Sequence, residues 1–90
     1  MNTTDTTSAG EQRRVVVQVP GVDFLGVGIE PVIERQPSGF VSMAIITYPD
    51  GDKCGSGALG SFETEDDAYR CAVTYGRSEA ERRLLMTLFE

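Results

Sequence analysis

The alternation of apolar and polar residues predicts short strands in the first two thirds of the chain. Residues 40–48 (Phe-Val-Ser-Met-Ala-Ile-Ile-Thr-Tyr) form the longest apolar run, which predicts the central strand of a sheet. Before this run, Ile29 and Ile33 alternate with Glu30 and Glu34. Because successive side chains of a strand point to opposite faces, this pattern predicts a strand with one buried and one solvated face.

Shorter segments around these two strands predict the rest of the sheet. Residues 13–19 are rich in valine and predict a first strand, and the glycines within residues 22–28 predict an irregular loop. Pro31 is typical of an edge strand or of a strand that starts late. Turns are predicted at residues 37–39 and 49–52, and a short strand at residues 57–62. These segments together predict an antiparallel meander of three or four strands.

A helix is predicted to begin immediately after Thr64. Its hydroxyl suits an N-cap, and the three acidic residues 65–67 lie where the unpaired amides of a helix favour negative charge. Ala68, Ala72 and Tyr75 then fall on one face of the predicted helix.

The apolar residues further along this helix project in another direction. Ala80, Leu84 and Leu88 leave an ideal helix on a different side from Ala68 and Ala72. Gly76-Arg77-Ser78 supplies a helix end, and Ser78-Glu79-Ala80-Glu81 supplies a second capping box. We therefore predict a C-terminal helix that is kinked or broken near Gly76–Ser78.

These elements predict one α+β domain, in which an antiparallel meander is packed on one face by the C-terminal helix. Residues 13–90 form this domain, and residues 1–12, which have no aliphatic run, are predicted to be a disordered tail. The 90 residues carry a net charge of −6, which repels nucleic-acid phosphates and argues against nucleic acid as a partner. No secretory signal or membrane-spanning run is visible, so we expect a cytoplasmic protein without a membrane partner.

Candidate chemistry is sparse along the chain. There is no histidine to activate a serine, and the acidic groups at residues 50–52 and 63–67 belong to a turn and a helix cap. Residues 55–60 match the letters of the dinucleotide-binding fingerprint, but a hairpin turn precedes them and more strand follows. We therefore predict no enzyme activity, no catalytic residue, no cofactor, no metal ion and no small-molecule substrate. Whether Cys54 and Cys71 form a disulfide stays open, with free thiols favoured.

The densest apolar group outside the strands lies at the C-terminus. Such a segment either folds back on the sheet as core or contacts another chain, because large exposed apolar patches are rare on monomers. In the second case the contact partner is a different protein or a second copy of this chain. The predicted partner interface consists of Leu84, Leu85, Leu88 and Phe89.

Two resemblances accompany this interpretation. Residues 60–68 (Gly-Ser-Phe-Glu-Thr-Glu-Asp-Asp-Ala) and 72–77 resemble short uncharacterised beta-proteobacterial proteins with a Phe-x-Thr-x-x-x-Ala strand-to-helix junction, and the likeness covers about residues 13–80. That resemblance implies a bacterial protein with this fold and supplies no active site. The spacing of Phe62, Thr64 and Ala68 also resembles AP2-like and integrase N-terminal DNA-binding domains, which implies a sheet that enters the major groove.

The central strand at residues 40–48 departs from the DNA-binding pattern because it has no charged residue. The sequence therefore predicts a small non-catalytic protein-protein interaction module. A nucleic-acid-binding module with a sheet-based topology is the alternative.

Overall fold

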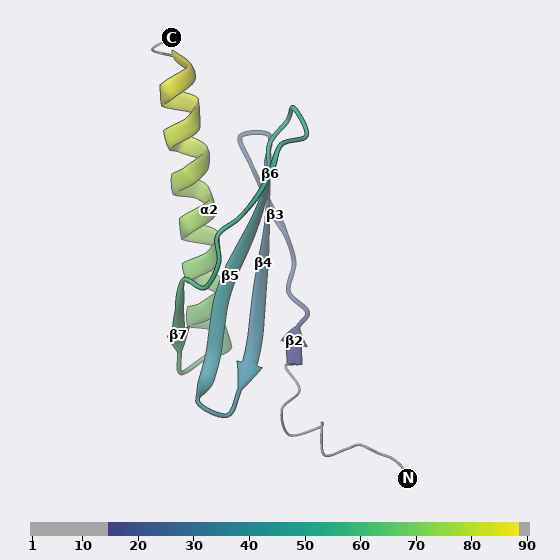
Figure 1. Cartoon of the computed structure of the whole chain (residues 1–90), viewed down its shortest axis with the longest axis vertical. Coiled ribbons are helices and arrows are strands. Elements are labelled where there is room, and N and C mark those ends of the chain that lie inside the picture. Colours follow the sequence, from purple (N-terminus) through teal and green to yellow (C-terminus); the bar gives the residue numbers. More distant parts are fainter. Residues whose placement is uncertain (1–14, 89–90) are drawn as a thin grey trace.

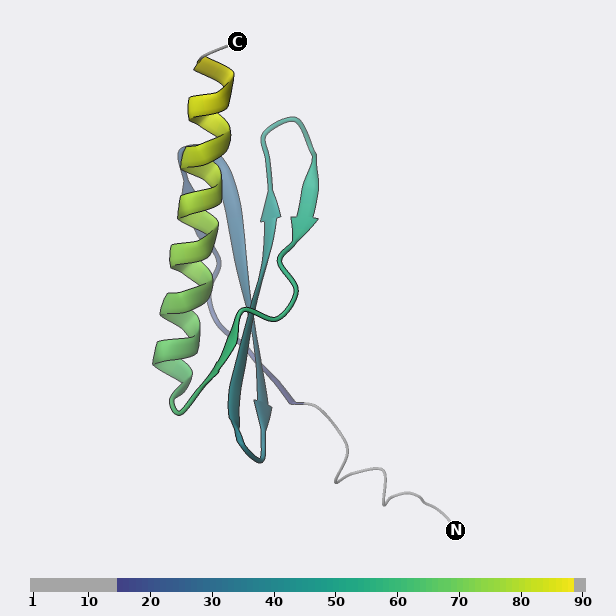
Figure 2. The same ribbon diagram turned by 60° about the vertical axis from the view of Figure 1, so that its left-hand side comes forward.

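The computed structural model describes residues 15–88, which form an antiparallel sheet with one helix on it (Figure 1). The two long strands, β4 (Val27–Gln36) and β5 (Gly39–Thr47), pair along their whole length. The helix α2 (Glu65–Leu88) lies along one face of these strands (Figure 2). The predicted α+β class with a C-terminal helix on one sheet face is confirmed. The predicted tail at residues 1–12 lies outside the described residues.

The number of strands differs from the prediction, because each outer position of the sheet is divided in two. β2 (Val15–Val17) and β3 (Val22–Phe24) both pair with β4. On the other side, β6 (Lys53–Gly55) and β7 (Gly60–Phe62) both pair with β5. The sheet formed by residues 15–88 therefore has six strands and not three or four, although it is only four strand positions wide.

Local chemistry explains where the outer strands are interrupted. Pro20 and Gly21 separate β2 from β3, because proline lacks an amide hydrogen for the ladder. Between β6 and β7, the Ala44 amide donates to Ser56 Oγ at 2.9 Å, and the Ser56 amide donates to the Ala44 carbonyl at 2.9 Å. A serine side chain thus replaces part of a strand ladder, and the predicted strand at residues 57–62 is reduced to Gly60–Phe62.

The predicted irregular loop at residues 22–28 is instead a β-hairpin, so that prediction is wrong. Phe24 pairs with Val27, and the two residues between them have positive φ angles, 56° at Leu25 and 81° at Gly26. Two consecutive positive φ angles are the geometry of a type I′ turn, which matches the twist of the strands it joins. The sequence did not indicate it because leucine rarely adopts a positive φ.

The alternation predicted around Ile29 is confirmed. Ile29 and Ile33 are buried beneath α2, whereas Glu30 is exposed on the other face of β4. Pro31 lies inside β4, which is paired on both sides, but residues 30–32 fall between the registers of β3 and β2 and pair with β5 alone. Pro31 therefore occupies the stretch of β4 whose outer edge has no strand neighbour.

The start of α2 follows the prediction. The Asp67 amide donates to Thr64 Oγ1 at 3.1 Å, so Thr64 is the N-cap. Buried Ser42 of β5 donates from its hydroxyl to the Ala68 carbonyl at 2.6 Å, which ties the first turn of the helix to the sheet. The predicted junction of a short strand, a capping threonine and a helix is therefore present.

The predicted kink or break near Gly76–Ser78 is wrong, because α2 continues through these residues as a single helix. Its buried positions recur four residues apart, and such a row winds slowly around a helix as it follows a twisted sheet. Gly76 is part of this row, where a Cβ atom would lie only 2.6 Å from Ile29 Cγ2. It therefore permits close packing and does not end the helix. The buried row consists of Ala68, Ala72, Gly76 and Ala80.

Candidate interaction surface

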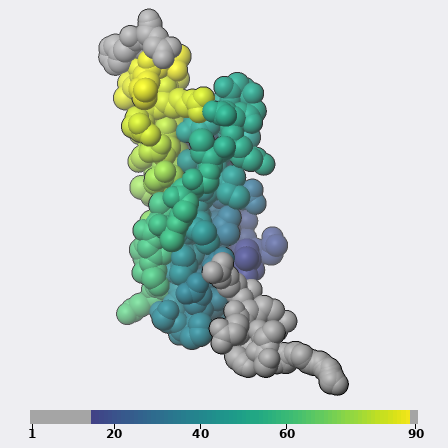
Figure 3. Space-filling model, viewed as in Figure 1, coloured from purple at the N-terminus to yellow at the C-terminus, as the bar shows by residue number. Residues whose placement is uncertain are grey.

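Large exposed apolar side chains gather at one end of the molecule. Beyond Ala80, the last buried residue of α2, the helix runs past the end of the sheet (Figure 1). Figure 3 shows these C-terminal turns beside the turn that connects β5 to β6. The side chains left in water there are Leu25 at 62%, Leu84 at 48%, Leu85 at 54%, Met86 at 57% and Leu88 at 70% of their full exposure.

A groove of about 260 Å³ lies between the helix end and the two neighbouring turns. Leu84 and Thr87 form its helix side, and Leu25 and Pro49 form its sheet side. The hairpin that carries Leu25 is held against α2, where the Arg77 guanidinium lies 5.1 Å from the centre of the Phe24 ring. We call this hollow the end groove; it is lined by Leu25, Val27, Tyr48, Pro49, Asp50, Ala80, Arg83, Leu84 and Thr87.

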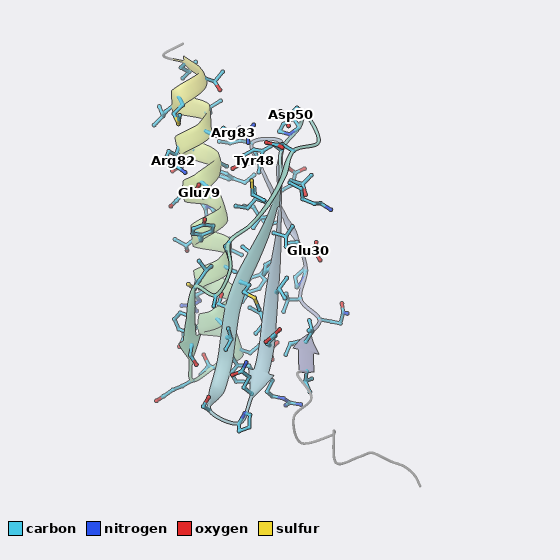
Figure 4. The ribbon with its side chains drawn as sticks, viewed as in Figure 1. Glu30, Tyr48, Asp50, Glu79, Arg82 and Arg83 are labelled. Atoms are coloured by element: carbon cyan, nitrogen blue, oxygen red, sulfur yellow. The ribbon has the colours of Figure 1, made fainter. Side chains whose placement is uncertain are left out.

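Arg83 joins the helix end to the β5–β6 turn. Its guanidinium lies 3.9 Å from the centre of the Tyr48 ring, and its Nη2 is 3.2 Å from Asp52 Oδ2 and 3.6 Å from Asp50 Oδ2 (Figure 4). Partial desolvation lowers the pKa of Arg83. The Tyr48 hydroxyl and the two carboxylates raise this pKa by a larger amount, so the net shift is upward. The guanidinium therefore stays charged and fixes one wall of the end groove.

The turn that receives Arg83 is itself ordered. The Gly51 amide donates to the Tyr48 carbonyl at 2.8 Å, and the Asp52 amide donates to Asp50 Oδ1 at 2.9 Å. Gly51 has a φ of 93°, which favours glycine. The predicted turn at residues 49–52 is present, and its carboxylates face a cation, an arrangement that suits a structural role.

A second hollow of about 520 Å³ lies on the opposite side of Arg83. Met86 lines it together with Cys54, and Arg82 is paired there with Glu79. This hollow is more polar than the end groove and contains no cluster of nucleophile and base. Cys54 is exposed and Cys71 is half-buried, and both thiols are free.

Three of the four predicted interface residues lie in the described part of the chain, in the last turns of α2. Leu84, Leu85 and Leu88 are exposed, which removes the alternative that they form part of the core. Phe89 lies outside the described residues. Sequence reasoning missed Leu25, because its segment was interpreted as a loop and nothing in its local pattern pointed to the helix end.

The remaining candidates from the sequence are separate from this surface. The glycine-rich residues 55–60 connect β6 to β7 and do not lead from a strand directly into a helix. Within residues 15–88 no group of three metal-ligating side chains occurs, and no helix in that range is long and apolar enough to cross a membrane.

Comparison of the chain with models of protein families, with curated proteins and with solved structures finds no match. Both resemblances inferred from the sequence therefore remain predictions, and the case for function depends on the geometry of this chain alone.

Proposed function

We propose that this chain is a non-catalytic protein-interaction module, and that the end groove with the C-terminal turns of α2 is its contact surface. The observation that carries the proposal is the clustering of exposed leucines beyond the end of the sheet. Burying a large aliphatic side chain stabilises a contact by about 1.5–3 kcal/mol, so a few of them suffice for a specific interaction. The partner is another protein or a second copy of this chain.

The conformation of Leu25 supports the same surface. A leucine at positive φ costs about 1–2 kcal/mol, and an asparagine would fit this turn position better. Leu25 is nevertheless one of the most exposed large apolar side chains of the described residues, and it borders the end groove. Strain at a residue that contributes little to the core is typical of a residue kept for binding.

The test replaces Leu84 and Leu88 by serine in the full chain. Because both side chains are already exposed, we expect circular dichroism and thermal unfolding to stay close to wild type. Proteins captured by the wild-type chain from its native cell, or a concentration-dependent increase in mass during sedimentation, should be lost in the double variant. Val15→Ser, which removes an exposed apolar group from β2, is the matched control. Equal capture and equal mass for wild type and double variant would refute the proposal.

Leu25→Asn separates binding from folding at the same surface. Asparagine suits a positive φ, so we expect unfolding to require about 0.5–1 kcal/mol more free energy. The same variant removes an apolar contact and should weaken partner capture. Higher stability together with unchanged capture would exclude Leu25 from the contact surface.

The nucleic-acid alternative has less support from charge. A sheet that enters the major groove would use the face opposite α2, and strand alternation places Asp23, Glu30 and Glu34 on that face with Lys53 as its only cation among residues 15–88. Binding to duplex DNA that weakens with salt and is reduced in Lys53→Ala would favour this alternative over the proposal.

A further inference from the structure

β5 carries apolar side chains on both of its faces, and the packing of α2 explains only one of them. Toward the helix, β5 presents the small side chains of Ser42 and Ala44, which allow the close approach of α2, and the large buried side chain of Ile46. On the opposite face it presents Val41, Met43 and Ile45. Three further apolar side chains of this strand, each half-buried, therefore point away from the only helix in residues 15–88.

The register of the sheet gathers these side chains into one patch. Met43 lies opposite Val32 of β4, and Ile45 and Val41 lie opposite Glu30 and Glu34. An antiparallel sheet with one solvated face normally presents polar residues there, whereas a strand apolar on both faces is typical of a sheet covered on both sides. We call this surface the open face; its apolar centre is Val32, Val41, Met43 and Ile45.

The border of the open face is acidic. Glu30 is exposed on β4, as Figure 4 shows, and Asp23 lies on the neighbouring strand β3. Glu34 adds a third carboxylate, and its Oε1 accepts a hydrogen bond from Gln36 Nε2 at 3.4 Å. Lys53 is the one cation that strand alternation places there among the described residues. The border therefore carries a net negative charge, as the whole chain does at −6.

We infer that the open face is a docking surface for a cationic amphipathic helix of another protein. Its apolar side would cover Val32, Met43 and Ile45, and its lysines or arginines would lie against Glu30 and Asp23. A helix on this face would complete a three-layer arrangement, in which both sheet faces are covered. The net charge of −6 would also attract such a partner from a distance.

Two other occupants fit less well. Two copies of the chain packed face to face would bring the acidic borders of both sheets together, which opposes association. Residues 1–14 contain only Met1 and Ala9 as apolar side chains, too few to cover the patch. Charge complementarity therefore selects a cationic partner.

The experiment uses two synthetic helical peptides of about four turns, one with leucines on one side and lysines on the other, and one with glutamates in place of the lysines. Binding to the full chain is followed by fluorescence anisotropy at low and high salt. We expect the lysine peptide to bind at least about tenfold more tightly than the glutamate peptide, with affinity that falls as salt rises. Amide chemical shifts should change in β4 and β5 and not in the last turns of α2.

Variants of the chain locate the site. Glu30→Lys should weaken binding of the lysine peptide by about threefold to tenfold, whereas Glu81→Lys, on the exposed side of α2, should change it far less. Met43→Thr/Ile45→Thr should abolish binding, with circular dichroism to verify folding. If that variant does not fold, the comparison of Glu30→Lys with Glu81→Lys decides alone.

Three outcomes would overturn the inference. Equal affinity for both peptides would remove the charge argument, and equal effects of Glu30→Lys and Glu81→Lys would place binding elsewhere. A wild-type dimer that dissociates in Ile45→Thr but persists in Leu84→Ser/Leu88→Ser would identify a second copy as the occupant. A dimer that dissociates in Leu84→Ser/Leu88→Ser but persists in Ile45→Thr would involve the end groove and not the open face. The experiments therefore distinguish a failure of this inference from a failure of the proposed function.

Discussion

Up to Ala80, the fully buried residues of α2 have small side chains, whereas after Ala80 its apolar residues are large and exposed to water. Both halves belong to one continuous helix, and neither contains a proline. What separates them is the support beneath: the first half rests on β4 and β5, and the second half passes beyond their ends. In this helix, small residues therefore mark the supported half, residues 65–80, and exposed leucines mark the free half, residues 81–88.

The largest expected effect comes from enlarging a residue of the supported half. In Gly76→Ala the new methyl group would lie 2.6 Å from Cγ2 and 2.8 Å from Cγ1 of buried Ile29. Alanine favours a helix over glycine by about 1 kcal/mol, but overpacking a buried site costs about 1–3 kcal/mol and larger residues cost more. We expect net destabilisation by about 1–2 kcal/mol in urea unfolding.

Ser78→Ala is the matched control for this substitution, because Ser78 is exposed in the same turn of the helix. It should be neutral or slightly stabilising. If Gly76→Ala were as stable as wild type, the close packing of α2 on Ile29 would not limit the size of residue 76.

A smaller effect is expected at the start of the supported half. Thr64→Ala removes the acceptor of the Asp67 amide and should reduce the free energy of unfolding by about 1 kcal/mol. Thr64→Ser keeps a hydroxyl at the cap and should retain most of the stability. A loss of equal size in both variants would show that the methyl group of Thr64 matters and the cap hydrogen bond does not. Thermal unfolding of the three proteins makes this comparison.

The smallest effect is expected at Arg83, which connects the free half to the β5–β6 turn. Arg83→Gln removes the charge that faces Tyr48, Asp50 and Asp52 and keeps most of the side-chain stem. Because these contacts are exposed to solvent, we expect the global unfolding temperature to change little. Amide hydrogen exchange should become faster in residues 81–88 and stay unchanged near Ala68. Unchanged exchange in both halves would show that the Arg83 contacts do not hold the helix end.

Much of the fold was accessible from the sequence because several signals were local. The apolar run of residues 40–48, the alternation around Ile29 and the cap at Thr64 each depend on a few adjacent residues, and the structure contains all three. The errors concern residues whose role depends on distant neighbours. Gly76 resembles a helix end until Ile29 is placed against it, and Leu25 resembles a loop residue until its hairpin is seen.

The candidate surface could be predicted only in part. The leucines of the last turns were identified, but whether they were buried or exposed depended on where the sheet ends beneath the helix. The length of a strand can be predicted from sequence only approximately. Because a single strand was predicted at residues 57–62, the division of the outer position beside β5 into β6 and β7 was not foreseen. Leu25 joins the surface through the fold of the β3–β4 hairpin alone.

The division of the outer positions has a consequence for how the chain behaves in a crowded solution. Long, flat strand borders recruit further strands and lead to fibres, and natural sheets avoid this with short or proline-interrupted borders. Here β2, β3, β6 and β7 each have only three residues, and Pro31 lies in the stretch of β4 that no outer strand covers. The short outer strands therefore protect the long apolar strand β5 from the addition of strands from other molecules. Exposed leucines at one end of the chain then do not lead to fibres that grow through the sheet.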